Sequence, residues 1–264
     1  MSQPVGQNAP NQEADVALIQ ALLNINLPRI PDASFLIEDG KLGQRSQAVL
    51  ENFQNTVATP GAASGVIEPE STTFQSLRSV VNGALDATVL QIVMPLSTTQ
   101  QAAKYIQPLM AAMDANQINT PLRKAHFLAQ LGHESASMIY TSEIANGNAY
   151  EGRADLGNTQ PGDGPLFKGR GLIQITGRNN YTAYGKARNR DFITGDNPKL
   201  LATDPNLAAD SAGWFWATRN LNALADQDDV LAITKKINGG TNGLDDRKLR
   251  LNICKCLLVP ELSA

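Results

Sequence analysis

Residues 122–138, LRKAHFLAQLGHESASM, contain the pattern from which the rest of the chain can be interpreted. A threonine and a proline precede this stretch and predict the N-cap and first turn of a helix that runs towards Met138. Phe127, Leu131 and Glu134 are spaced by four and three residues, so they share one helical face. Partial desolvation beside this apolar stripe favours a protonated Glu134, as a general acid requires. A surface glutamate paired with a basic residue would give the same pattern.

A second carboxylate, Glu143, follows Glu134 after nine residues. On an unbroken helix it would lie on the opposite side and about 13 Å farther along the axis. Residues 135–148, SASMIYTSEIANGN, carry polar residues and a glycine, so we expect the helix to end and a loop to bring Glu143 back. Two carboxyl groups about 6.5–9.5 Å apart, with a water between them, are typical of an inverting glycosidase.

Other chemistries are disfavoured. Ser137 stands where the zinc motif HExxH needs its second histidine, and no serine lies in a GxSxG motif. The chain has two histidines, too few for a three-histidine zinc site, although a mixed site with carboxylates stays open. The glycines of residues 168–181, KGRGLIQITGRNNY, lack the spacing of a phosphate loop. We expect them to shape a cleft wall with polar groups at Gln174, Thr176 and Asn180.

Periodic apolar residues predict three short helices around one core over residues 13–80. The positions are Val16, Ile19, Leu22, Leu23, Val49, Phe53, Phe74 and Leu77, with Val80 as a further candidate on the third helix. Pro69 is expected in the first turn of the third helix. Residues 1–12 are polar and predict a flexible N-terminus, and residues 81–98 mix Gly, Ala and apolar residues, as expected of a linker.

Residues 99–264 are predicted to form a larger, mainly helical domain, with residues 171–176, GLIQIT, as the candidate strand. Trp214, Phe215 and Trp216 are consecutive in a helix-like segment and cannot share one face. We therefore expect core packing rather than sugar stacking from this aromatic cluster.

The composition is that of a soluble globular protein, with 42% hydrophobic and 18% charged residues. No run approaches the roughly 18 apolar residues that span a bilayer, so no stable membrane insertion is expected. The N-terminus lacks the basic and then apolar segments of a signal peptide, which predicts synthesis in the host cytoplasm.

The charge is unevenly distributed. Residues 1–99 contain 4 basic and 9 acidic residues, against 18 basic and 16 acidic residues in the remainder, and no basic run indicates nucleic-acid binding. Cys254 and Cys256 are expected to stay reduced.

The first part of the chain resembles the peptidoglycan-binding domain of many bacterial and phage cell-wall hydrolases. The resemblance rests on residues 39–54, DGKLGQRSQAVLENFQ, and residues 65–77, GVIEPESTTFQSL, and covers about residues 13–80. A helical bundle used only for packing against the next domain is the alternative.

The second part resembles the family 19 glycoside hydrolases, which comprise plant and bacterial chitinases and phage endolysins. The resemblance covers about residues 100–256 and rests on AHFLAQLGHESAS at 125–137, the run from Glu143 to Tyr181, WFW at 214–216 and INGGTNGLDDR at 237–247. It implies a mainly α fold, with a small three-helix binding domain joined to a larger lysozyme-like catalytic domain.

The family resemblance also implies roles for individual residues. Glu134 matches the general acid, Glu143 the general base and Thr176 the residue that holds the attacking water. The matched sugar-binding positions are Gln174, Asn180 and Asn238. The basic residue that supports the acid lies after the NGG turn, where Arg247 and Arg250 are both candidates.

Glu151 is a rival for the base because it lies in the well-matched YEGR segment. The spacing of the compact bacterial members favours Glu143, and we expect Glu151 to pair with an arginine such as Arg153 or Arg170. His133 is expected to orient the acid helix or bond to backbone rather than to act in catalysis.

The sequence thus predicts a monomeric, cofactor-free endolysin that hydrolyses the β-1,4 bonds of peptidoglycan by inversion, as a muramidase or lysozyme-like enzyme. Peptidoglycan is the expected partner, and the cell wall in the periplasm is the expected site of action, reached through a membrane lesion or a secretion machine. The alternatives are a chitinase with the same mechanism, a secreted antibacterial effector and a non-catalytic wall-binding protein.

Overall fold

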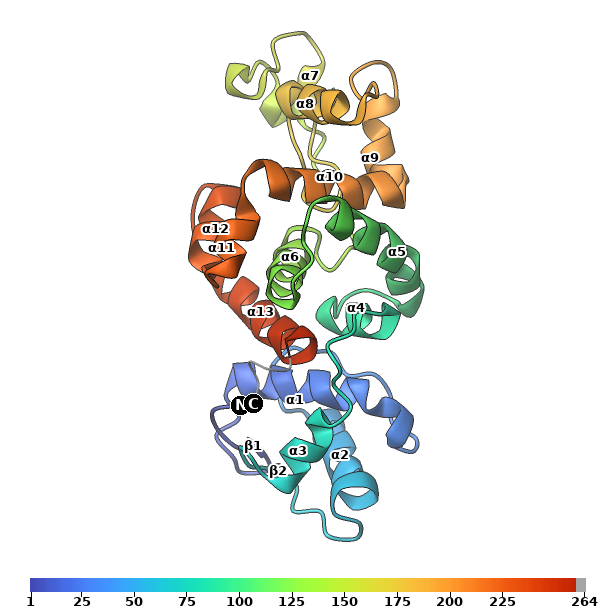
Figure 1. The fold of residues 1–264 in the computed structure, drawn as a ribbon, viewed down its shortest axis with the longest axis vertical. Coiled ribbons are helices and arrows are strands. Elements are labelled where there is room, and N and C mark those ends of the chain that lie inside the picture. The colour runs from blue at the N-terminus through green and yellow to red at the C-terminus, as the bar shows by residue number, and fades with distance from the viewer. Residues whose placement is uncertain (260–264) are drawn as a thin grey trace.

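The computed structural model describes residues 1–259, so the last five residues of the predicted domain 99–264 lie outside the described part. The fold is mainly helical, which confirms the predicted class (Figure 1). Within residues 1–259 no helix is both long and apolar enough to cross a membrane.

Three helices form the N-terminal part: α1 (Glu13–Ile25), α2 (Gln44–Phe53) and α3 (Thr72–Arg78). A 3-10 turn (Leu27–Arg29) follows α1 and a π-helical turn (Gln54–Ala58) extends α2. The eight helical positions predicted for this core are buried, whereas Val80, which lies beyond the end of α3, is only partly buried. Helix α3 begins later than Pro69 predicted, because the side chain of Ser71 caps it by accepting the amide of Phe74.

Residues 1–12 are ordered, and the predicted flexible N-terminus is wrong. Strand β1 (Val5–Gly6) pairs antiparallel with β2 (Val66–Ile67). The buried carboxylate of Asp15 accepts the amide and hydroxyl of Ser2 at 2.8 Å and the amide of Gln3 at 2.9 Å. A strand of two residues has no periodicity to detect, and its partner lies about sixty positions away in the sequence, so the polar composition was misleading.

The predicted linker, residues 81–98, contains helix α4 (Ala87–Val93) instead of a plain connection. Asp86 caps it by accepting the amide of Val89 at 2.8 Å. Its apolar residues are buried against α1 and α5 (Thr99–Ala115). The helix is too short to show a clear period, which is why its apolar run resembled a connecting segment.

Helix α6 (Pro121–Glu134) lies at the centre of the larger part, enclosed by α4, α5, α10 (Pro205–Thr218), α12 (Val230–Asn238) and α13 (Leu244–Leu258) (Figure 1). Helix α11 (Leu221–Asp226) also packs on α6. The ring of Phe127 meets that of Trp216 edge-on at 5.3 Å between centroids. Trp214, Phe215 and Trp216 are all buried, which confirms the predicted core role of this cluster.

Short elements joined by glycine-rich loops form the outer lobe between α6 and α10 (Figure 1). They are two 3-10 turns (Asn148–Tyr150 and Ala154–Leu156), α7 (Asp163–Leu166), α8 (Arg178–Arg188), a further 3-10 turn (Asn197–Lys199) and α9 (Leu200–Thr203). Residues 171–176 are not a strand, because Ile175 makes only an isolated bridge with Arg170. The positive φ of Gly171 and Gln174 breaks the extended backbone there.

The N-terminal helices are docked on the larger part. Helix α1 packs directly against α13 and α4 (Figure 1). Cys254 and Cys256 of α13 form no disulfide, and both thiols are buried.

Candidate active site

Helix α6 ends at Glu134, four residues earlier than predicted, and the backbone leaves it through a strained turn. Ala136, Ser137 and Met138 have φ of 46°, 60° and 68°, the left-handed region that costs non-glycine residues about 1–2 kcal/mol each. The hydroxyl of Ser135 accepts the Met138 amide at 2.8 Å, and the Ser137 amide donates to the Gly132 carbonyl at 2.8 Å. The chain therefore turns away from the helix axis immediately after Glu134.

Glu134 faces a buried guanidinium. Arg247, in the first turn of α13, donates from Nη2 to Glu134 Oε1 and from Nη1 to Gln130 Oε1, and is 1% exposed. Its Nε also donates to the Asn242 carbonyl at 3.3 Å. Of the two arginines that the sequence left open, Arg247 is the one in contact with Glu134.

Arg250 contacts the neighbours of Glu134 instead. Its Nε donates to Asp246 Oδ2 at 2.8 Å, and its Nη1 donates to the Ser137 hydroxyl at 3.2 Å. Asp246 Oδ2 also bonds His133 Nδ1 at 2.7 Å. Burial raises the pKa of Asp246, but the hydrogen bonds from His133 and Arg250 outweigh it and lower the pKa to about 2. Asp246 is thus an anion between two donors.

Glu143 lies in the loop after α6 and is fixed mainly by backbone and phenol contacts. Its Oε1 accepts the Tyr150 hydroxyl at 3.1 Å, and its Oε2 accepts the Gly169 amide at 3.2 Å. Lys168 Nζ donates to the carbonyl of Glu143 at 2.7 Å. Burial, together with the charge of Glu143, raises the pKa of Tyr150 and keeps that phenol a donor.

Gly169 brings Glu143 and Gln174 together. A Cβ added at Gly169 would lie 2.9 Å from Gln174 Oε1 and 3.4 Å from Glu143 Oε2, so both side chains lie against this glycine. The Gln174 amide donates to the Gly171 carbonyl at 2.8 Å and to the Tyr140 carbonyl at 3.3 Å. The predicted base and a predicted sugar-binding residue are therefore neighbours in the structure.

Thr176, Asn180 and Asn238 each bond to nearby backbone. The Thr176 hydroxyl donates to the Gln174 carbonyl at 3.0 Å, and Asn180 donates to the Thr176 carbonyl at 2.7 Å, which links both to Gln174. Asn238 closes the turn before α13 by donating to the Asn242 carbonyl at 2.9 Å. Arg247 bonds the same carbonyl, so this turn and the arginine beside Glu134 are positioned together.

Glu151 does not pair with an arginine, and that expectation is wrong. Its two oxygens accept the amides of Gly162 and Gly164, each at 2.7 Å, at the start of α7. Arg153 pairs with Asp155, and Arg170 donates to the Leu166 carbonyl and the Tyr181 hydroxyl. The free amides at the start of a helix attract a carboxylate. The carboxylate of Glu151 binds these amides instead of a nearby arginine.

Sequence reasoning missed several residues of the site. Gln130 lies one helical turn before Glu134, so the four-residue spacing could have indicated it. Asp246 precedes Arg250 by the same spacing, which is typical of a helical ion pair. Tyr150 and Gly169 carry no such signal, because their contact with Glu143 depends on how the loops fold.

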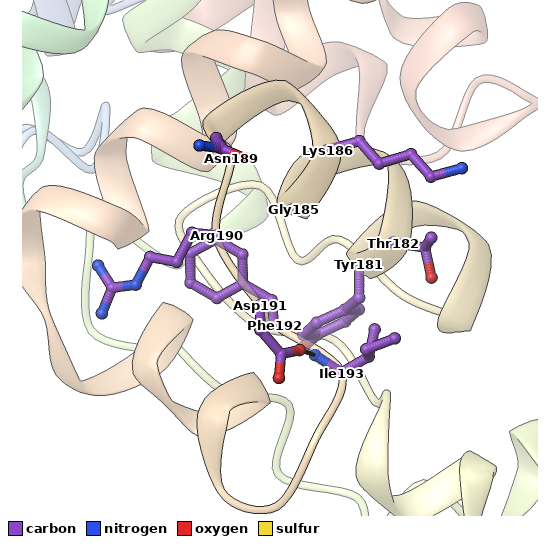
Figure 2. A pocket seen from close by; sticks show the side chains of 9 residues that line it. All are labelled: Tyr181, Thr182, Gly185, Lys186, Asn189, Arg190, Asp191, Phe192 and Ile193. Atoms are coloured by element: carbon purple, nitrogen blue, oxygen red, sulfur yellow. Dashed lines mark hydrogen bonds between the residues drawn. The ribbon is translucent and has the colours of Figure 1, made fainter.

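A hollow of about 450 Å³ lies beside α8 and is separate from these residues (Figure 2). Its walls include the rings of Tyr181 and Phe192, which are almost fully buried, and neither Glu134 nor Glu143 lines it. Because none of the candidate site residues lines this hollow, it is not the candidate cleft.

Comparison with known proteins gives one consistent family. A sequence profile described as chitinase class I matches residues 100–235. A glycosyl hydrolase family 19 domain-containing protein of Haemophilus influenzae is 33% identical over 157 residues, which are 48% of this chain and 75% of that protein. An endochitinase of Arabidopsis thaliana is 41% identical over 116 residues, 44% of this chain and 38% of that protein.

Solved structures agree in fold. Chitinase C from Streptomyces griseus superposes with a TM-score of 0.55 at 23% identity, over 66% of this chain and 92% of that chain. A class IV family 19 chitinase from Zea mays gives a TM-score of 0.52 at 24% identity, over 66% and 90%.

Proposed function

Because the chain belongs to family 19 of the glycoside hydrolases, the chitinase class I family, we propose that it hydrolyses the β-1,4 bonds of peptidoglycan by inversion. The observation that carries the proposal is the end of α6. There Glu134 lies partly buried against Arg247, and the backbone turns at once into the loop that carries Glu143.

The proposed mechanism uses Glu134 as general acid. Its proton moves to the oxygen of the scissile bond as that bond breaks, and the aglycone leaves as an alcohol. The carboxylate that remains is stabilised by the charge of Arg247, whose position is in turn fixed by Gln130 and the Asn242 carbonyl. Arg247 thus assists the loss of the proton without exchanging one itself.

Glu143 is the proposed general base. It removes a proton from a water as that water attacks the anomeric carbon from the face opposite the leaving group. The Tyr150 hydroxyl and the Gly169 amide orient its carboxylate. We assign Thr176 to holding the water and Gln174, Asn180 and Asn238 to the sugar, with Gln174 nearest to Glu143.

The N-terminal part, residues 13–80, is proposed to bind peptidoglycan and so to raise the concentration of the enzyme at its insoluble substrate. Its resemblance to wall-binding domains supports peptidoglycan as the substrate, and a role as an endolysin in the lysis of bacterial cells. Binding is tested by sedimenting purified wall with the Glu134→Gln protein, and a protein that stays in the supernatant contradicts it.

A chitinase is the second candidate, because the plant relatives and the similar structures are named chitinases. The test compares turnover of purified peptidoglycan with that of soluble chitin oligomers, with Glu134→Gln as the inactive control. Mass spectrometry of the products identifies the sugar at the new reducing end, and NMR of its first-formed anomer tests inversion. Faster turnover of chitin oligomers would favour the second candidate.

A further inference from the structure

Three side chains from the first two turns of α13 contact the last two residues of α6 and one residue of the turn that follows it. Arg247 bonds Glu134, Asp246 bonds the residue before it, His133, and Arg250 bonds Ser137 in the turn after it. Glu134 is therefore flanked on both sides by contacts from one helix, and two of these three contacts involve neither the acid nor its arginine.

Asp246 connects the two flanking contacts. Its Oδ2 bonds both His133 Nδ1, at 2.7 Å, and Arg250 Nε, at 2.8 Å. Arg250 reaches Ser137 from its other end. A single carboxylate oxygen thus links the residue before Glu134 to the turn after it.

Both flanks need such a restraint. Ser137 lies in the middle of the left-handed run, a backbone conformation that persists only where the surroundings impose it. The His133 ring is confined on its other side by Gly243, where an added Cβ would lie 2.0 Å from His133 Cε1. Without Asp246, the ring loses its hydrogen bond and the Arg250 guanidinium loses the partner that aims it at Ser137.

Within residues 1–259, a second carboxyl group interacts with Arg250. Glu38 of the N-terminal part lies near enough to interact with it, but burial raises the pKa of Glu38 to about 8, so this carboxyl is neutral near pH 7. Asp246 is thus the ionised partner of Arg250 at that pH, with a pKa of about 2.

We infer that Asp246 is a positioning residue for the reaction: through His133 and Arg250 it fixes both flanks of Glu134 and the direction in which the chain leaves towards Glu143. This inference rests on the proposed roles of Glu134 and Glu143. An ordinary helical ion pair between Asp246 and Arg250 would leave turnover unaffected, which separates the two explanations.

The test compares Asp246→Asn with Asp245→Asn, the same chemical change one residue away. Asp245 is fully exposed and its cationic neighbour Lys248 is 4.0 Å distant. A misplaced acid lowers kcat without weakening substrate binding, so Asp246→Asn is expected to lower kcat by about 10- to 100-fold with KM within about twofold. Asp245→Asn is expected to stay within about twofold in both. Unchanged kcat in Asp246→Asn, or a loss equal to that of Asp245→Asn, overturns the inference.

Hydrogen exchange measured by mass spectrometry on the same proteins gives a readout that needs no activity. The amides of Ser137 and Met138 are hydrogen-bonded inside the strained turn, so Asp246→Asn is expected to speed exchange over residues 135–140 and to leave α1 unchanged. If the unmodified protein cleaves neither polymer, the proposed function fails, and the exchange pattern alone decides the positioning role. Equal exchange in the two variants contradicts it.

Discussion

Glu134 and Glu143 are fixed by different kinds of structure. Glu134 lies at the end of a buried helix and is contacted by a buried arginine on a second packed helix. Glu143 lies in a loop, where a phenol and one backbone amide contact its carboxylate and the next side chain, Ile144, is 79% exposed. The proposed acid is thus held by side chains of packed helices, whereas the proposed base is held by contacts within loops, which have fewer buried apolar neighbours.

The strongest test of this contrast replaces Glu143 and Glu151 in turn. Glu143→Gln removes the proposed base and is expected to lower kcat about 10²–10⁴-fold. Glu151→Gln should keep near-normal kcat and instead lose about 1–3 kcal/mol of stability, because its carboxylate accepts two backbone amides. Reducing-sugar assays and urea denaturation measure the two effects. Loss of turnover in Glu151→Gln with activity retained in Glu143→Gln would reverse the assignment.

The helical side is tested by Arg247→Met, which leaves Glu134 and Gln130 without their buried partner. Breaking one side of such a pair is expected to cost about 3 kcal/mol in unfolding free energy and to lower kcat as well. The exposed neighbour Lys248 provides the control, because Lys248→Met should change neither quantity. If both variants unfold at the same urea concentration, the contacts of Arg247 with Glu134 and Gln130 stabilise the fold less than we conclude.

A substitution of Glu38 tests whether the tight packing around Glu134 extends to the N-terminal helices. Its pKa, raised to about 8 by burial, means that the native state keeps a proton that the unfolded chain releases above about pH 4.5. Stability should therefore fall as pH rises from about 4.5 to 8. Glu38→Gln lacks this loss, so it should exceed the unmodified protein by about 2–4 kcal/mol at pH 9 and differ little at pH 4. Urea denaturation at both values measures it, and a difference independent of pH contradicts the buried neutral carboxyl.

Gly243→Ala is expected to have a smaller effect on stability and kcat, through the His133 ring next to Glu134. The new Cβ would overlap the His133 ring, and φ is +67°, so we expect a loss of about 1–3 kcal/mol with a lower kcat. Gly240→Ala is the matched control, since its added Cβ meets no atom within 4 Å. The measurements are thermal unfolding and turnover of the two variants. Equal stability and equal kcat would mean that the His133 ring can move aside without affecting either quantity.

The same contrast limits what could be predicted from the sequence. Helices α1, α2, α5 and α6 bury apolar faces, so their spacing was visible. Strand β1 escaped because its partner strand lies far away in the sequence, and helix α4 escaped because it is too short to show a clear period. Spacing placed Glu134 on the correct face, but Arg247 and Arg250 lie three residues apart on α13 and only packing separates their partners. The backbone partners of Glu151 depended on a loop that has no period at all.

The docking of α1 on α13 has a practical consequence for Cys256. This thiol borders a hollow of about 370 Å³ together with Leu18 of α1 and Phe74 of α3, and burial raises its pKa to about 11. The thiolate is the form that attacks alkylating reagents, so labelling is expected to be slow while α1 and α3 cover Cys256 and faster when they move away. The chain thus contains a native thiol whose rate of modification reports on movement of the N-terminal helices away from α13, the helix that contacts the proposed acid.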